Sequence, residues 1–194
     1  MKKVVVIGAG AAGMMAAITA AQSGASVTLI EKNEKTGKKI FITGKGRCNV
    51  TNGCEHDEFF ENIVTNSKFL YSAYAAFDNR SMMELLKEAG CPLKEERGKR
   101  IFPQSDHSSD VIAALNRLLK KERVKVLFHT AVRELLLEEL PEEAQREASK
   151  DSAKQKVSGV LLVDGTTIKA DAVIVATGGQ SYEATGSTGD GYRL

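Results

Sequence analysis

The chain has 194 residues, 42% of them hydrophobic and 27% charged, a composition typical of a globular protein rather than a disordered or fibrous one. Twenty-seven basic residues face 25 acidic ones, and the net charge of +2 favours neither nucleic acid nor an anionic membrane as a partner. The three cysteines have no CxxC spacing and cannot all pair with one another, which favours a reduced, cytoplasmic protein.

The N-terminal segment predicts a strand, a helix and a second strand. Residues 3–7 form a β-branched run, typical of a parallel strand that is buried on both faces. Residues 11–22 predict an alanine-rich helix that ends at Gly24, and residues 26–30 predict the second strand. The basic and apolar N-terminus superficially resembles a secretory signal, but a signal would not explain the glycines that follow the first strand.

A GxGxxG motif, Gly8 to Gly13, lies at the junction of the first strand and the helix. In such motifs the first glycine permits a tight turn, the second lets the backbone approach a pyrophosphate, and the third lets the helix pack closely. The helix then presents free N–H groups to the phosphates. Glu31 follows the second strand, where a carboxylate can accept both ribose hydroxyls and repels a 2′-phosphate, which argues against NADP.

A lone GxGxxG is weak evidence, but here strand, glycines, helix, second strand and acid occur in register. Residues 3–31 therefore predict a β-α-β unit that binds the ADP part of a dinucleotide. Its candidate binding residues are Gly8, Gly10, Ala11, Ala12, Gly13, Glu31 and Lys32.

The middle of the chain predicts a loop followed by helices. Residues 36–53 are rich in Gly, Lys, Asn and Thr and predict a structured loop. Residues 57–90 predict helices, with Asn79 or Ser81 as a cap and Glu84 placed for a capping box. Together with an amphipathic helix that follows Asp110, they form a helical insertion at about 54–122.

The second half of the chain predicts mainly strands. Asp164 and Gly165 have the composition of a hairpin turn. The stretch 138–156 is expected to be a mobile hairpin excursion or a solvated helix. Strands are expected at 99–102, 124–128, 132–137, 157–163, 166–169 and 171–176.

The strand at 171–176 distinguishes FAD from NAD. Flavoproteins with two dinucleotide-binding domains begin with the GxGxxG motif and return through a β-meander to such a strand, whose Thr-Gly-Gly turn approaches the same cofactor. An NAD dehydrogenase would more often continue through regular β-α repeats. Thr177, Gly178 and Gly179 would be an ordinary loop by themselves, but together with the motif they favour FAD.

The segment 38–52 contains two glycines, several asparagines and the basic residues Lys39 and Arg47. The basic side chains are able to meet phosphate oxygens or the electron-rich edge of a flavin. A polar turn with solvated charges fits the spacing equally well, so the residues alone leave both interpretations open.

This segment resembles a family of bacterial flavoproteins known as aminoacetone oxidases or bile-acid enone reductases. The matching motifs are Gly8 to Gly13, the Gly44-Lys45-Gly46-Arg47-Cys48-Asn49-Val50-Thr51-Asn52 loop, Arg100 to Pro103, Gly178 to Tyr182 and Thr185 to Tyr192. One departure is Lys45, which stands where the family more often has glycine.

The resemblance implies non-covalent FAD, with residues 39–49 wrapped around the cofactor and the backbone of Val132 against the adenine. It adds Lys39, Gly46, Arg47, Cys48, Asn49 and Val132 to the candidate binding residues. Members of the family continue through a second, substrate domain, so residues 1–194 are expected to be the FAD-binding part of a longer protein.

Other kinds of site are less well supported. A redox thiol is one interpretation of Cys48, but this residue has no partner at CxxC spacing, and a small buried residue in a tight loop fits better. The histidines and cysteines lack metal-ligand spacing, and neither a Ser-His-Asp arrangement nor paired carboxylates are found. No catalytic residue is therefore assigned.

The sequence predicts an α/β, Rossmann-like FAD-binding domain with a helical insertion and a β-meander. Its expected function is hydride transfer between FAD and a small organic substrate, by amine oxidation or enone reduction, with NAD(P)H or oxygen as the electron partner. The alternative is a non-catalytic FAD- or NAD-binding module or an inactive fragment of such an enzyme. No membrane partner is expected, and the sequence does not indicate the oligomeric state.

Overall fold

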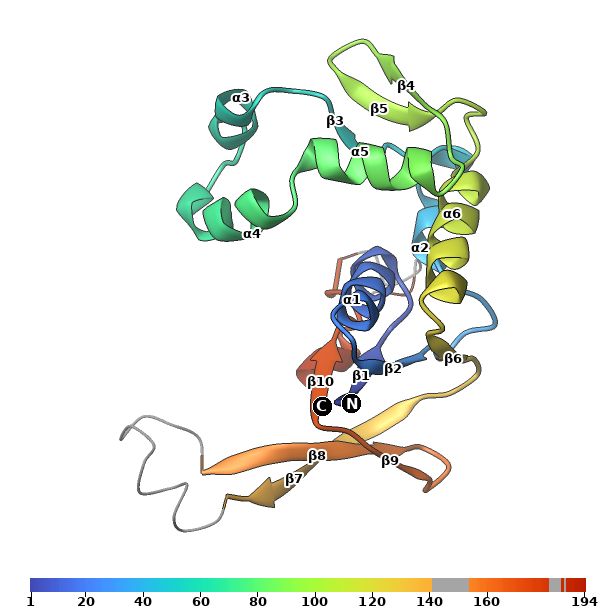
Figure 1. Ribbon diagram of the computed structural model, residues 1–194, viewed down its shortest axis with the longest axis vertical. Helices are drawn as coiled ribbons and strands as arrows, with labels where there is room; N and C mark the ends of the chain where they lie inside the picture. Colours follow the sequence, from blue (N-terminus) through green and yellow to red (C-terminus); the bar gives the residue numbers. More distant parts are fainter. Residues whose placement is uncertain (141–153, 182–185, 187) are drawn as a thin grey trace. The chain divides into compact units, whose positions relative to one another are not determined.

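The computed structural model describes residues 1–140, 154–181, 186 and 188–194 (Figure 1). The chain divides into two compact units, one formed by Met1–Lys39 with Leu118–Leu194 and the other by Ile40–Arg117. Most of the stretch 138–156, and the residues 182–185 and 187 of the family motifs, lie outside the described residues.

The first unit is built on a four-stranded parallel sheet in the order β10-β1-β2-β6. A three-stranded antiparallel sheet, β7-β8-β9, forms the expected meander. The elements of this unit are β1 Lys3–Ile7, α1 Ala11–Gln22, β2 Ser26–Ile30, β6 Lys125–Leu127, β7 Val132–Glu139, β8 Gln155–Leu162, β9 Thr167–Lys169, β10 Ala172–Val175 and a 3₁₀ turn at Asp190–Tyr192.

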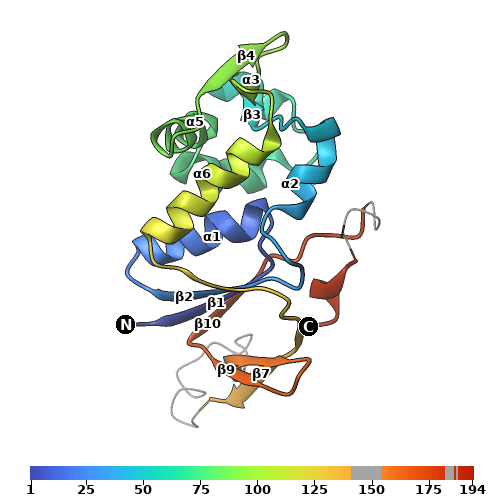
Figure 2. The ribbon, with the colours of Figure 1, turned by 90° about the vertical axis from the view of Figure 1, so that its right-hand side faces the viewer.

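The parallel sheet is covered on both faces within this unit: α1 lies on one face and the β7-β8-β9 sheet on the other (Figure 2). The buried core between the two sheets contains Val5, Ile7 and Ile30 from the parallel sheet and Val160 and Leu162 from the meander. This double coverage explains why β1 and β2 consist of continuous apolar runs rather than alternating ones. The predicted α/β, Rossmann-like class is confirmed.

Helix α1 ends as the sequence predicts. Gly24 has a φ of +85°, and its N–H donates to the carbonyl oxygen of Ala21, while the N–H of Ala25 donates to that of Ala20. These two bonds satisfy carbonyl groups at the end of the helix, and the left-handed conformation favours glycine.

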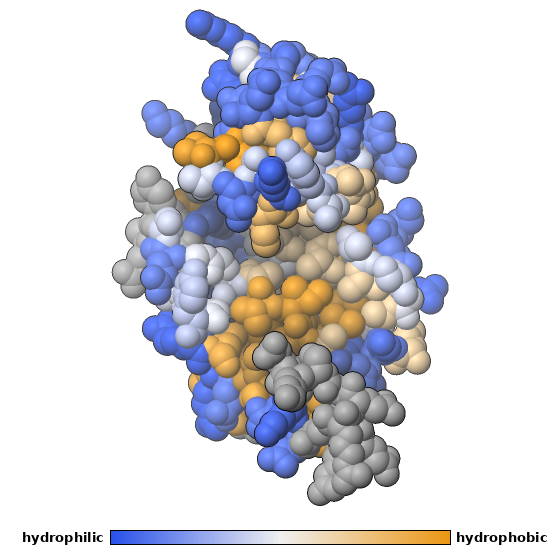
Figure 3. All heavy atoms as spheres, turned by 90° about the vertical axis from the view of Figure 1, so that its left-hand side faces the viewer, coloured by the Kyte–Doolittle hydropathy of each residue, from blue (hydrophilic) through white to orange (hydrophobic). Residues whose placement is uncertain are grey.

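Strand β10 forms one edge of the parallel sheet and, in the part of the chain that the structure describes, pairs only with β1. Ile174 and Val175 on this strand are 36% and 43% exposed. Figure 3 views the molecule from the side of this edge and shows apolar side chains gathered there. Strand β10 therefore presents backbone hydrogen-bonding groups and apolar surface at the same edge.

The second unit contains short helices around a small antiparallel sheet, β3-β5-β4. Helix α6, Ser108–Lys121, leads the chain back into the first unit. The other elements are α2 Lys38–Ile42, whose first two residues belong to the first unit, a 3₁₀ turn at Thr43–Gly46, β3 Thr51–Asn52, α3 His56–Glu61, a 3₁₀ turn at Ser67–Leu70, α4 Tyr71–Ala76, α5 Asn79–Glu88, β4 Leu93–Glu96 and β5 Arg100–Pro103.

Two predictions for this unit, a loop and a helix cap, were wrong in detail, and one strand was missed. The loop predicted at 36–53 contains the short helix α2, and the strand β4 was not predicted. The N-cap of α5 is Asp78, whose carboxylate accepts hydrogen bonds from the N–H and the hydroxyl of Ser81 at 2.7 Å each. Asn79, one of the predicted caps, is buried instead and donates to the carbonyl oxygens of Asn52 and Cys54.

The core of the first unit yields a stability prediction. Leu162 is 5% exposed and packs in the core, whereas its neighbour Val163 is 63% exposed. Leu162→Ala should lower the free energy of unfolding by about 2–5 kcal/mol, because truncation leaves a cavity. Val163→Ala should change it by less than about 0.5 kcal/mol. Equal effects of the two substitutions in urea denaturation would contradict the described packing of Leu162 in the core.

Candidate functional site

The carboxyl ends of three parallel strands meet at one edge of the first unit. Ile7 of β1 is in register with Ile30 of β2 and with Val175 of β10. The chain leaves these strands at Gly8, Glu31 and Ala176, so the glycine motif, the acidic residue and the Thr-Gly-Gly turn emerge side by side. Open α/β sheets bind ligands in this position.

Two of the motif's glycines are required by close packing. A Cβ atom added to Gly13 would lie 1.7 Å from the carbonyl oxygen of Gly8. Gly8 has a φ of +100°, and a Cβ atom there would lie 2.6 Å from the carbonyl oxygen of Ala176. A Cβ atom on Gly10, in contrast, would meet nothing within 4 Å. The packing thus leaves open space at Gly10, at the beginning of α1.

The N-terminus of α1 lacks any charge or cap of its own. Gly10 is the N-cap and supplies no side-chain hydrogen bond, and the first turn contains no acidic residue. Ala11 and Ala12 are exposed. Backbone N–H groups and roughly +0.5 of an elementary charge therefore face outward, an arrangement that binds phosphate groups.

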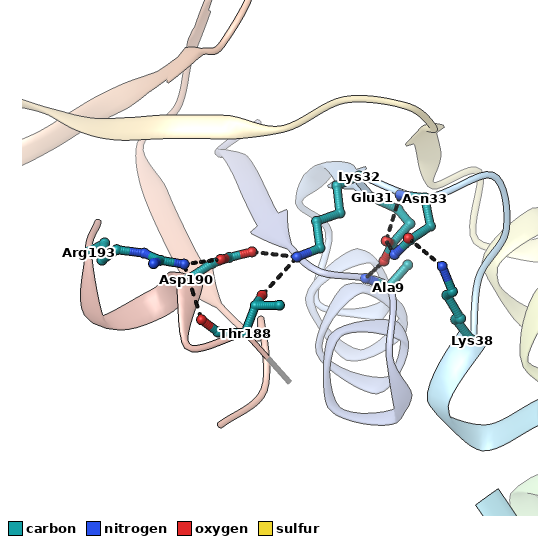
Figure 4. Close-up of polar contacts among 8 residues, drawn as sticks. All are labelled: Ala9, Glu31, Lys32, Asn33, Lys38, Thr188, Asp190 and Arg193. Carbon is teal, nitrogen blue, oxygen red and sulfur yellow. Dashed lines mark hydrogen bonds and ion pairs between the residues drawn. The ribbon is translucent and has the colours of Figure 1, made fainter. Parts of the chain in front are cut away.

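Glu31 follows β2 directly and is 8% exposed. Its Oε2 accepts a hydrogen bond from the N–H of Ala9 at 2.8 Å, within the glycine motif. Its Oε1 accepts two bonds from Asn33, from the backbone N–H at 2.9 Å and from the side-chain Nδ2 at 2.5 Å. Lys38 Nζ donates to Asn33 Oδ1 at 2.8 Å (Figure 4). Glu31 was predicted from the sequence, whereas Asn33 and Lys38 were not.

Lys32 points away from Glu31 and holds a segment from the other end of the chain (Figure 4). Its Nζ donates to Thr188 Oγ1 at 2.9 Å and to Asp190 Oδ2 at 2.6 Å. Arg193 donates to the other oxygen of Asp190 at 2.6 Å. The hydrogen bond from Lys32 is the main cause that lowers the pKa of Asp190 from 3.8 to about 2.

The Thr177–Gly179 turn is packed tightly against the same C-terminal segment. The N–H of Gly189 donates to the carbonyl oxygen of Gly179 at 3.2 Å. A Cβ atom on Gly191 would lie 2.6 Å from Thr177 Oγ1. Gly178 has a φ of +82°. The turn that follows β10 is therefore held by close contacts with the C-terminal segment.

Val132 and Lys39 complete the predicted residues of the first unit. Val132 begins β7 and packs on the core, two residues after Thr130, whose N–H donates to the carbonyl oxygen of Glu31 at 3.0 Å. This bond places the start of β7 beside the end of β2. Lys39 Nζ lies 3.5 Å from the carbonyl oxygen of Ser181.

The remaining predicted residues, at 46–49, belong to the second unit, where Arg47 is bonded to two carboxylates. Its guanidinium donates to Glu96 and Asp106 and lies 4.2 Å above the ring of Phe102. The hydrogen bond to Glu96 is the largest cause that raises the pKa of Arg47, and the hydrogen bond to Asp106 is the second. Lys94 also donates to Asp106, and Lys94 and then Arg47 lower the pKa of that carboxyl group.

The neighbours of Arg47 have defined environments as well. In the orientation that places the side-chain amide nitrogen of Asn49 against the carbonyl oxygens of Ile101 and Thr51, it donates to them at 3.2 Å and 3.0 Å. Cys48 is a free, half-buried thiol, and burial raises its pKa, so the unreactive thiol form is favoured at neutral pH. Gly46 has a φ of +85° and is exposed.

Within the residues that the structure describes, no group of three or more His, Cys, Asp or Glu side chains is placed to hold a metal ion. None of the described helices is long and apolar enough to cross a membrane.

The glycine motif yields a paired prediction. Gly13→Ala should lower the melting temperature strongly, because its Cβ atom would overlap the carbonyl oxygen of Gly8 and push α1 away from β1. Gly10→Ala should lower the free energy of unfolding by no more than about 1 kcal/mol, since the added methyl group meets open space and only alanine's weaker preference for the N-cap position opposes it. Thermal unfolding of both variants tests this, and equal losses would contradict the described packing.

The Lys32–Asp190 pair yields a pH prediction. Because the pKa of Asp190 is lowered in the folded chain, the pair stabilises the fold above about pH 4 and loses this effect as the pH falls towards 2. In an NMR titration, Asp190 should titrate near 2 and, in Lys32→Met, closer to 3.8. Lys125→Met, a substitution on β6, is the matched control and should leave the titration unchanged.

The sequence of the whole chain matches a known family. The family model described as "HI0933-like protein Rossmann domain" matches residues 2–194. The 3-dehydro-bile acid delta(4,6)-reductase of Clostridium scindens is 36% identical over 201 residues, covering 100% of this chain and 43% of that protein. The ribosomal RNA dihydrouridine synthase of Haemophilus influenzae is 30% identical over 190 residues, covering 98% of this chain and 43% of that protein.

The chain thus spans about 43% of the length of these two relatives. The bile-acid reductase part of the predicted resemblance is confirmed, while neither of these two relatives is named an aminoacetone oxidase.

Solved structures share the fold. A 3-ketosteroid-delta4-(5alpha)-dehydrogenase from Rhodococcus jostii RHA1 has a TM-score of 0.63 at 18% identity and covers 93% of this chain and 47% of its own. The THI4 protein of Thermovibrio ammonificans has a TM-score of 0.62 at 16% identity and covers 91% of this chain and 57% of its own. The match over residues 2–194 decides the assignment: the chain belongs to the HI0933-like protein Rossmann domain family.

Proposed function

We propose that this chain binds FAD and is the cofactor-binding part of an oxidoreductase that reduces a carbon–carbon double bond conjugated with a carbonyl group. The observation that carries the proposal is the match to the family over residues 2–194, on a chain whose strand-end edge has the geometry for a dinucleotide. FAD, when bound, would supply the hydride for the reduction.

The residues of the first unit fit the ADP half of FAD. The open space at Gly10 and the uncapped N-terminus of α1 suit a pyrophosphate, and the buried carboxylate of Glu31 suits a ribose hydroxyl. The proposed binding residues of this unit are Gly8, Gly10, Ala11, Ala12, Gly13, Glu31, Lys32, Lys39, Val132, Thr177, Gly178 and Gly179.

In the second unit we assign Gly46, Arg47, Cys48 and Asn49 to the cofactor. The existing contacts of Arg47 and Asn49 determine the role that these two residues would play. Arg47 and Asn49 already bond to partners within this unit, so they would act chiefly by shaping the loop. Gly46 is exposed and in a left-handed conformation, so a ligand would approach its backbone without meeting a side chain.

The substrate class follows from what the relatives are named to do. A delta(4,6)-reductase of a 3-dehydro-bile acid reduces a double bond that is conjugated with a ketone. A dihydrouridine synthase reduces the ring double bond that is conjugated with a carbonyl group of uracil. Both reactions add a hydride to the far carbon of a conjugated double bond and a proton to the near one. This shared chemistry favours reduction over amine oxidation.

The charge balance favours a small molecule over RNA. Nucleic-acid binding requires a strongly basic surface, and the net charge of this chain is +2. Electrons would come from NAD(P)H, with oxygen as a competing acceptor. The three free cysteines support a reducing, cytoplasmic setting.

The test has two stages. The purified 194-residue chain should take up FAD and turn yellow, while Gly10→Ala, which keeps the fold, should bind it at least about tenfold more weakly. The bound flavin should then be reduced under nitrogen and mixed with a 3-oxo-delta4 steroid, and single-turnover reoxidation followed at the flavin absorption band.

Reoxidation by the steroid that exceeds reoxidation in buffer supports the proposal. A chain that takes up no FAD contradicts it altogether. A chain that binds FAD but whose reduced flavin reacts with neither enone nor oxygen is a non-catalytic binding module, which contradicts the enzymatic part.

A further inference from the structure

The carboxylate of Glu31 has few acceptor positions left for a ligand. A carboxylate offers about four, two on each oxygen. Oε1 already accepts from the N–H and the Nδ2 of Asn33, and Oε2 accepts from the N–H of Ala9. Counting the contacts of the described residues, one position on Oε2 therefore remains, and Figure 4 shows the other oxygen turned towards Asn33.

Asn33 is itself held from two directions. Its carbonyl oxygen accepts from the N–H of His129 at 3.1 Å, which fixes the backbone. Its Oδ1 accepts from Lys38 Nζ at 2.8 Å, so the amide oxygen faces the ammonium group and the NH₂ group faces Glu31. Rotating the amide by half a turn would place NH₂ against an ammonium group and oxygen against a carboxylate, which is unfavourable on both sides.

We infer that Asn33, oriented by Lys38, makes Glu31 an acceptor for a single ribose hydroxyl. This inference rests on the proposed binding of FAD. It corrects the expectation that Glu31 accepts both hydroxyls: one hydroxyl bonds to the free position on Oε2, and the second must bond to water or backbone. Asn33 and Lys38 are positioning residues, and their effect is to make the two hydroxyls contribute unequally.

The inequality can be measured with ADP and its two deoxy analogues on the full chain. Because a hydrogen bond to a charged acceptor is strong, removal of the recognised hydroxyl should weaken binding by roughly 10- to 100-fold. Removal of the other should weaken it by less than about threefold. Isothermal titration calorimetry with ADP, 2′-deoxy-ADP and 3′-deoxy-ADP gives the ratio of the two losses.

Substitutions test whether Asn33 causes the unequal contribution of the two ribose hydroxyls. Asn33→Ala removes the side-chain donor, keeps the backbone N–H and frees one position on Oε1, so the ratio of the two losses should fall towards one. Lys38→Met should shift it in the same direction, and Lys38→Arg, which keeps a donor, should restore it. Asn62→Ala is the matched control, because within the described part of the chain its side-chain amide bonds only to the backbone carbonyl of Glu58 in α3.

The outcomes distinguish a failure of the unequal hydroxyl recognition from a failure of FAD binding itself. Equal losses for both analogues in the wild-type chain, or an unchanged ratio in both Asn33→Ala and Lys38→Met, would overturn the inference while leaving FAD binding intact. A wild-type chain that binds neither ADP nor FAD would overturn the proposed function, and the inference with it. Because the ratio compares two ligands on one variant, reduced folding of a variant does not alter it.

Discussion

Strand β1 is hydrogen-bonded on both sides, to β2 and to β10, and the candidate site depends on these two ladders. The pairing with β2 is local, but the contact between Lys3 and Asp171 at the start of β10 spans 168 positions. Because all three strands are parallel, their carboxyl ends share one edge, and only there do Gly8, Glu31 and Thr177 come together. The entropic cost of closing a loop grows only with the logarithm of its length, by about 0.6 kcal/mol per doubling. The second unit, which lies between the paired strands in the sequence, therefore adds little to the cost of pairing β1 with β10.

The parts of this edge that the sequence predicted are those with a local signature. A strand, three glycines, a helix and an acid within residues 3–31 need no distant partner to be identified, and the glycine roles follow from backbone geometry alone. The bonds from Asn33 and Lys38 to the Glu31 network leave no such signature, because a positioned amide and a solvated one look alike in a polar stretch. The Lys32–Asp190 pair joins residues 158 positions apart, and spacing carries no information at that range.

In the second unit, long-range pairing overrode local preference. Strand β4 contains Lys94, Glu95 and Glu96, which have low strand propensity, and it exists as the antiparallel partner of β5, whose Ile101 is 1% exposed. The prediction of the N-cap of α5 was wrong for a related reason. Asp78 and Asn79 are both good N-cap residues, and the buried contacts of Asn79 with the backbone of Asn52 and Cys54 leave Asp78 for the helix.

The loop at 43–47 shows the same use of charge as the Glu31 network. Gly44, Lys45 and Gly46 have φ values of +69°, +55° and +85°, and for a lysine this conformation costs about 1–2 kcal/mol. Such strain persists where neighbouring contacts determine the backbone, and Arg47, bonded to Glu96 and Asp106, is the next residue. The conformation fits the expectation, drawn from the family resemblance, of a glycine at position 45. In both units, then, charged side chains are bonded to other side chains, and they act by fixing the backbone and carboxylate groups that a ligand would meet.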